Sequence, residues 1–157
     1  LYLQEQGADS YEALVEKVAT TTADFNGRMD GIKTAEHRMD EIVQLQKHMG
    51  AYKRTLDVYR QYRASGWSNR FYDEHAAEIL LHKAAKAHFD SLGLKKLPSM
   101  QLLRQKYATL TAEKKKLYAG YKAAKEEMVA WQNAKRNVDT ILRGDGTAQR
   151  NHDIGLQ

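Results

Sequence analysis

The chain has 157 residues, of which 42% are hydrophobic and 29% charged, with ten glycines, one proline, no cysteine and a formal net charge of +5. So few turn-forming residues argue against a sandwich or barrel of short strands, and the lack of cysteine excludes disulfides, thiol nucleophiles and cysteine-based zinc sites. No apolar run is long enough to cross a bilayer, so we expect no membrane insertion, and the lack of cysteine fits a cytoplasmic protein.

The first residues predict the end of a truncated helix. Leu1–Gln6 lacks an initiator methionine and the basic, apolar pattern of a signal peptide, which suggests a fragment of a longer protein. Gly7 then separates this segment from the next helix. Asp9 is suited to cap that helix, with Glu12 three residues later as a capping box requires.

A first long helix is predicted over residues 10–64, because this range holds no proline and no turn cluster. Its apolar residues recur at steps of three and four, with a shift of the stripe near Met39. Gly27, Gly31 and Gly50 each weaken a helix by roughly 1 kcal/mol relative to alanine, so the sequence leaves open whether the helix is continuous there. The expected stripe runs through Tyr11, Val15, Val18, Thr22, Phe25, Met29, Ile32, Met39, Val43, and then Ile42, Leu45, Met49, Tyr52, Leu56 and Tyr59.

A shorter second helix is predicted over residues 70–92, after the turn cluster 65–69. Asn69 is suited to cap its start and Gly93 to end it. Its middle segment, 76–81, is apolar on more than one side, so we expect cover from more than one direction.

The third helix, predicted over residues 99–143, has the clearest pattern in the chain. Pro98 ends the preceding segment and Ser99 is a good N-cap. Thirteen positions from Met100 to Leu142 alternate steps of three and four, and eleven of them are apolar or alanine, as in a coiled-coil seam. Glycines follow at 144 and 146, and residues 144–157 are expected to be a disordered tail.

Two long helices with matching seams, joined by a short one, predict an all-α fold. We expect a long antiparallel coiled-coil-like helical hairpin, with the short helix as a head at the turn end. Residues 1–143 would then form a single helical domain. Two helices make a thin core, so a homodimer is a possible way to cover the remaining apolar surface.

The charge is unevenly distributed along the chain. Residues 1–46 carry four basic and nine acidic side chains, a net charge of −5, whereas residues 47–136 carry nineteen basic and eight acidic ones, a net charge of +11. Aromatic residues lie among the basic ones, and this combination suits a nucleic-acid backbone with stacked bases. The alternative is that the aromatics belong to the seam and the lysines to a solvated face. The predicted DNA-binding residues are Lys47, Lys53, Arg54, Arg60, Arg63, Arg70, Lys95, Lys96, Arg104, Lys106, Lys114, Lys115 and Lys116.

Other combinations of residues offer only weak signs of chemistry. His75, Glu78 and His82 lie close to one helix face and are a possible metal site, although Glu78 and His82 are equally an ordinary helix pair. The run 59–63 pairs two tyrosines with two arginines, as a tyrosine nucleophile with basic neighbours would require, but the lack of metal ligands nearby favours a helix-face aromatic pair. No phosphate-binding loop or serine-histidine-aspartate motif is present. We therefore predict no catalytic residue, no metal and no cofactor.

Several segments, taken in their order and spacing, resemble the C-terminal helical region of relaxases, the mobilization proteins of conjugative and mobilizable elements of gut Firmicutes. The likeness covers roughly residues 5–143. Its pieces are the segments 10–14, 52–53, 59–63, 71–75, 78–86, 92–99, 113–118, Tyr121 and 137–139.

The resemblance implies a role in DNA transfer. Relaxases nick one strand at an origin of transfer, become joined to its 5′ end through a tyrosine, and pass through a type IV secretion channel. Their catalytic tyrosine and histidine triad lie in an N-terminal domain, and no residue of this chain matches those motifs. The resemblance therefore implies a non-catalytic module that binds DNA, relaxosome components or the type IV coupling protein. The competing interpretations are a purely structural coiled-coil spacer or dimerisation arm, and a small helical enzyme that uses His75, Glu78 and His82.

Overall fold

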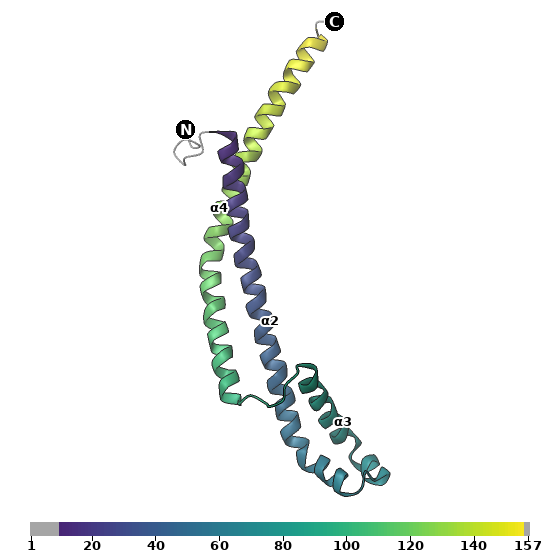
Figure 1. Cartoon of the computed structure of the whole chain (residues 1–157). Coiled ribbons are helices and arrows are strands. Elements are labelled where there is room, and N and C mark those ends of the chain that lie inside the picture. The colour runs from purple at the N-terminus through teal and green to yellow at the C-terminus, as the bar shows by residue number, and fades with distance from the viewer. Residues whose placement is uncertain (1–9, 156–157) are drawn as a thin grey trace. The chain divides into compact units, whose positions relative to one another are not determined.

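The computed structural model describes residues 10–155, and the side chains of residues 10–144. This range contains three helices and no strand, α2 (Tyr11–Ala64), α3 (Asn69–Ser91) and α4 (Met100–Gly155), shown in Figure 1. The prediction of an all-α protein is therefore confirmed. The expected helix over Leu1–Gln6 and the cap at Asp9 lie outside the described residues. Among the three helices, none combines the length and the apolar character that crossing a bilayer requires.

Helix α2 confirms the first predicted helix and is continuous through its three glycines. Ser10 caps its start, because the Ser10 hydroxyl accepts a hydrogen bond from the backbone N–H of Ala13 at 3.1 Å. A β-carbon at Gly31 would lie 3.0 Å from Cδ1 of Leu117, so glycine at this position allows α4 to approach closely.

Helix α3 begins one residue earlier than expected, and its cap is Ser68 rather than Asn69. The Ser68 hydroxyl accepts a hydrogen bond from the backbone N–H of Phe71 at 3.3 Å. His75 interrupts the regular geometry with φ −129° and ψ 25°, so the first turns of α3 are set off from the rest by a kink. The expected stop is confirmed, because α3 ends at Ser91, Leu92 is its C-cap, and Gly93 follows with a positive φ of 67°.

Helix α4 starts where predicted, but it continues to Gly155, past the end expected at Arg143. Gly144 and Gly146 each cost a helix only about 1 kcal/mol, and no proline follows to break it, so glycine alone was an unreliable stop signal. Residues 156–157 of the expected tail lie outside the described residues. The predicted cap is confirmed, because the Ser99 hydroxyl accepts a hydrogen bond from the N–H of Leu102 at 3.1 Å.

Replacing Ser99 with alanine should lower the free energy of unfolding by about 1 kcal/mol, because it leaves a backbone N–H of the first turn of α4 without its acceptor. Urea denaturation followed by circular dichroism measures the effect. Ser99→Asp, which keeps an acceptor and adds a negative charge near the helix N-terminus, serves as the control and should be close to the unchanged protein. No loss in Ser99→Ala, or an equal loss in Ser99→Asp, would mean that the hydrogen-bond acceptor at position 99 does not stabilise α4.

The chain divides into two compact units. Unit 1 comprises Leu1–Lys33 and Lys114–Gln157, and unit 2 comprises Thr34–Glu113. The expected single domain and the long hairpin with a head stay predictions.

In unit 1 the start of α2 packs against α4, and the two segments run in opposite directions. The Tyr11 hydroxyl donates a hydrogen bond to Asp139 at 2.6 Å, and the rings of Phe25 and Tyr121 lie 5.3 Å apart. Within α4, the Lys135 ammonium donates to Asp139 at 2.8 Å, and the hydrogen bonds from Lys135 and Tyr11 lower the pKa of Asp139.

The core of unit 1 centres on Leu14 and Trp131, which are 0% and 3% exposed. This corrects the expected stripe on the first helix, since Tyr11 and Val15 are 43% and 39% exposed. Apolar residues occupy two neighbouring faces of this turn, and the position of Trp131 selects the face that carries Leu14. Thr21 is also buried, with its hydroxyl donating to the Lys17 carbonyl oxygen at 2.7 Å.

In unit 2 all three helices contribute to one core. Leu45 of α2, Ala85 and Phe89 of α3, and Leu103 of α4 are buried together. Leu94 and Leu97, in the segment between α3 and α4, pack against them. This core holds α3 against the second half of α2 and fixes the side of α2 that is left to solvent.

Candidate nucleic-acid interface

Most of the predicted DNA-binding residues lie in unit 2, five of them in the second half of α2. Lys47 and Arg54 are seven residues apart, as are Lys53 and Arg60, so each pair shares one side of the helix. These four side chains and Arg63 in the last turn are all exposed. Residues 47–63 contain five basic side chains and one acidic side chain, Asp57.

The other predicted residues of unit 2 are exposed as well. Arg70 lies in the first turn of α3, Lys95 and Lys96 in the segment before α4, and Arg104 and Lys106 in α4. Residues 47–106 carry twelve basic and five acidic side chains, a net charge of +7. A strong excess of positive charge on exposed side chains attracts polyanions.

Ion pairing within the protein neutralises little of this charge. Among the predicted residues of unit 2, the structure shows one ion pair, between Nε of Arg70 and Oε1 of Glu74 at 3.3 Å. The Arg70 side chain is 91% exposed, so solvent screens the pair strongly.

The triplet Lys114–Lys116 belongs to unit 1. Lys115 and Lys116 are exposed, whereas Lys114 is half-buried with its ammonium 5.8 Å from the centroid of the Tyr118 ring. Lys114 is therefore engaged in a cation–π contact. That the triplet binds DNA together with the basic residues of unit 2 stays a prediction.

The aromatic residues between the basic ones are largely committed to packing. Tyr52 and Tyr59 stack on the ring of His82, with centroid distances of 4.5 Å and 4.3 Å. Tyr62 packs edge to face with Trp67, and its ring centroid lies 6.1 Å from that of Phe71. This packing supports the interpretation of the two tyrosines in 59–63 as an aromatic pair, with Arg60 and Arg63 directed to solvent.

His82 is a buried, hydrogen-bonded residue of the core, with 2% of its surface exposed. Its Nδ1 lies 3.0 Å from Oγ1 of Thr55, and the Thr55 hydroxyl lies 2.8 Å from the Ala51 carbonyl oxygen. Because a hydroxyl has one proton and this carbonyl accepts it, we infer that Nδ1 of His82 carries a proton and donates to Thr55. Sequence reasoning missed this pair, because Thr55 lies 27 residues from His82 along the chain.

The three residues considered for a metal site have different environments. His82 faces Thr55, Glu78 is exposed, and the half-buried His75 has its ring 4.4 Å from that of Phe71 at the kink of α3. In the part of the chain that the structure describes, no group of three or more histidine, aspartate or glutamate side chains is placed to hold a metal ion.

Lowering the pH below about 6.5 should destabilise the protein. Burial, followed by the nearby Lys86 charge, lowers the pKa of His82, and burial with the nearby His88 lowers the pKa of His48. The unfolded chain therefore takes up protons at a higher pH than the folded chain. The free energy of unfolding is largest above the ordinary histidine pKa and decreases as the pH drops through that value. Thermal denaturation between pH 8 and pH 5 measures this change.

The variant His82→Phe keeps an aromatic ring between Tyr52 and Tyr59 and removes the titrating group, so it should flatten the pH dependence. His37→Gln is the matched control, because His37 lies on the surface and its side chain is 75% exposed. An unchanged pH dependence in His82→Phe would show that another group is responsible.

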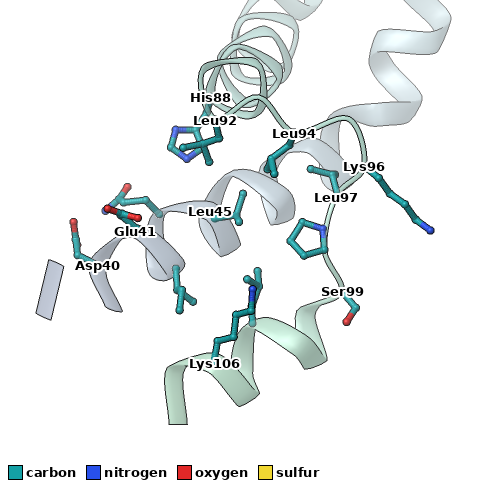
Figure 2. A pocket seen from close by; sticks show the side chains of 14 residues that line it. Asp40, Glu41, Leu45, His88, Leu92, Leu94, Lys96, Leu97, Ser99 and Lys106 are labelled. Carbon is teal, nitrogen blue, oxygen red and sulfur yellow. The ribbon is translucent and has the colours of Figure 1, made fainter. Parts of the chain in front are cut away.

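Unit 2 also contains a pocket that the sequence did not indicate. It has a volume of about 770 Å³, and most of its apolar lining consists of leucines of α2, α4 and the 92–99 segment, with Asp40, Glu41 and His88 on one side (Figure 2). Figure 2 shows Lys106 reaching from α4 into this space, whereas Lys96 points away from it. His88 stacks on His48 at 4.2 Å, and its Nε2 is buried and makes no hydrogen bond within the described residues.

Comparison with protein-family models, with curated proteins and with solved structures found no match for this chain.

Proposed function

We propose that this chain is a non-catalytic helical module that binds DNA through the basic side chains of unit 2. The observation that carries the proposal is the segment 47–63 of α2, where the exposed side chains of Lys47, Lys53, Arg54, Arg60 and Arg63 accompany a single acidic residue. Each lysine or arginine that neutralises a phosphate releases condensed counterions, and this entropy gain drives binding irrespective of sequence.

The direct test is the salt dependence of binding. The chain should bind fluorescently labelled duplex DNA in anisotropy titrations, and the logarithm of the association constant should fall linearly with the logarithm of the salt concentration. No binding at 50 mM salt, or binding insensitive to salt, would contradict the proposal.

The resemblance to relaxases supports a more specific role. We propose that the chain belongs to a relaxase-like protein that acts in the cytoplasm in conjugative DNA transfer, following its nuclease domain. Its basic surface would then hold DNA near the nicking site. The test is the reading frame around the gene, which should encode upstream a histidine-rich metal motif and a catalytic tyrosine. A different upstream domain would contradict this parentage.

Docking of relaxosome components or of the type IV coupling protein is a second candidate, and the pocket of unit 2 favours it. Leu94, Leu97 and Leu103 form apolar walls suited to an apolar side chain, and charges of both signs border them. Leu94→Glu places a charge among these walls. In the parent protein this change should abolish binding to the purified coupling protein in a pull-down assay and leave the DNA affinity unchanged.

A purely structural role, as a coiled-coil spacer or dimerisation arm, is the alternative. The antiparallel contacts between α2 and α4 inside unit 1 support it, and they also support the hairpin part of the proposed fold. Sedimentation equilibrium distinguishes a dimerisation arm from a spacer, because the apparent mass of a dimerisation arm should increase with protein concentration. A concentration-independent monomer that also fails to bind DNA would leave the spacer role.

A further inference from the structure

Trp67 occupies an unusual backbone position at the turn between α2 and α3. The turn closes α2 with two hydrogen bonds, from the N–H of Gly66 to the Arg63 carbonyl and from the N–H of Trp67 to the Tyr62 carbonyl, both at 3.1 Å. This is a Schellman motif, in which the residue after the C-cap is normally the left-handed one; here the C-cap is Ser65 and the left-handed residue is Gly66 with φ 73°. Trp67 follows with a φ of 61°, and it is the one non-glycine residue with a positive φ among the described residues.

The left-handed conformation is costly for a residue with a side chain, and such strain is found most often at functional sites. Packing in the turn explains part of the choice of tryptophan, because a Schellman motif commonly has an apolar contact between its last residue and the helix. Here that contact is between Trp67 and Tyr62, with ring centroids 5.1 Å apart. It does not explain the whole indole, since Trp67 remains 49% exposed.

The neighbouring aromatic rings hold Trp67 in place rather than cover it. Tyr59 and Tyr62 both meet the indole edge to face, at interplanar angles of 63° and 84°. Tyr59 is itself stacked on the buried His82, and Tyr62 lies against Phe71 and Tyr72. The tertiary structure therefore leaves Trp67 as the accessible ring of this cluster, while the tyrosines are used in packing.

Exposed basic side chains flank the ring along the chain. Arg60 and Arg63 lie in the last turns of α2, and Arg70 lies in the first turn of α3. A rigid, half-exposed aromatic ring among cationic side chains provides a surface on which an unpaired base stacks while the cations hold the backbone. Duplex DNA has its bases already stacked, so it does not use such a ring without unstacking.

We propose that Trp67 is a stacking platform for an unpaired nucleobase, so that the turn between α2 and α3 binds single-stranded nucleic acid. This inference rests on the proposed DNA-binding function and specifies its substrate class. Stacking on tryptophan is largely independent of base identity, so the site selects for single strands rather than for a sequence.

The experiment compares two single-stranded probes of equal length and equal phosphate number, oligo(dT) and the same strand built with abasic sites. The chain should bind oligo(dT) about tenfold more tightly than the abasic strand, and oligo(dT) should quench the fluorescence of Trp67. The other tryptophan, Trp131, is buried and supplies a constant background. The variant Trp67→Gly accepts the positive φ without strain, so it removes the ring and keeps the turn. It should bind both strands with the affinity of the unchanged protein for the abasic strand.

Tyr107→Ala is the control, because Tyr107 is an exposed aromatic residue beside Arg104 and Lys106 on α4, away from the turn. It should keep the preference for oligo(dT). Equal binding of the two strands by the unchanged protein, or a preference that survives in Trp67→Gly, would overturn the stacking proposal and leave the proposed DNA-binding function intact. Failure to bind either strand or duplex DNA would overturn both. Circular dichroism of each variant confirms that helicity is retained.

Discussion

Replacing Trp131 with alanine should lower the free energy of unfolding by about 3–5 kcal/mol, because the change empties most of the core of unit 1. Trp131 is 3% exposed and packs against the fully buried Leu14. Half-buried Val18, Ala134 and Val138 surround this pair and are too small to fill the space left behind. Urea denaturation, followed by circular dichroism at 222 nm, measures the loss.

Two further variants make this prediction specific to the core. Val129→Ala changes an exposed side chain of the same helix, 38% accessible, and should change the free energy of unfolding by less than about 0.5 kcal/mol. Leu14→Ala removes the other half of the contact and should cost about 2–5 kcal/mol. If Trp131→Ala behaves like Val129→Ala, then α2 and α4 do not pack through this pair in solution.

Neutralising Lys53, Arg54, Arg60 and Arg63 together, each to glutamine, should make duplex DNA binding clearly less dependent on salt. If each side chain neutralises one phosphate, the slope of log K against log salt becomes shallower by about 3–4. Raising the salt from 50 mM to 200 mM should then weaken the unchanged protein about 100-fold more than the variant. The loss should be the same for unrelated DNA sequences, because phosphate contacts carry no base information.

The matched control removes four positive charges from unit 1, at Lys33, Lys122, Lys125 and Arg136, all of which are exposed. Both variants have the same net charge, so a general effect of charge would affect them equally. We expect the control to keep most of the salt dependence. Equal losses in the two variants would mean that binding reflects the overall charge of the chain and not the surface of α2.

The helix caps and turns show how accurately the local sequence predicts where the helices begin and end in this protein. Ser99 was predicted as the cap of α4 because a short polar side chain after proline satisfies a backbone N–H within three residues. The same local logic placed the start of α3 one residue late, since Ser68 and Asn69 are both good caps and the turn selects Ser68. The end of α4 was missed because glycine disfavours a helix by an amount that a long helix tolerates.

In the candidate site, too, the sequence predicts some features and the tertiary structure decides others. Exposed lysines and arginines of α2 follow from the helical period, since residues seven apart share a side and the apolar side must face a core. The role of each aromatic residue does not follow from the period. Tyr59 and Trp67 lie among the same arginines in the sequence, yet one stacks on a buried histidine and the other is half-exposed.

The sequence by itself determined the helical class, the cap of α4 at Ser99 and the concentration of positive charge after residue 46, because all of these depend on neighbours within a few turns. Tertiary structure decided which of two apolar faces is buried at Leu14, that His82 pairs with Thr55 rather than with Glu78, and that Trp67 is the ring left to solvent. These outcomes depend on contacts between residues far apart in the chain, such as Leu14 with Trp131, and no local periodicity encodes the choice between two faces of equal apolar character.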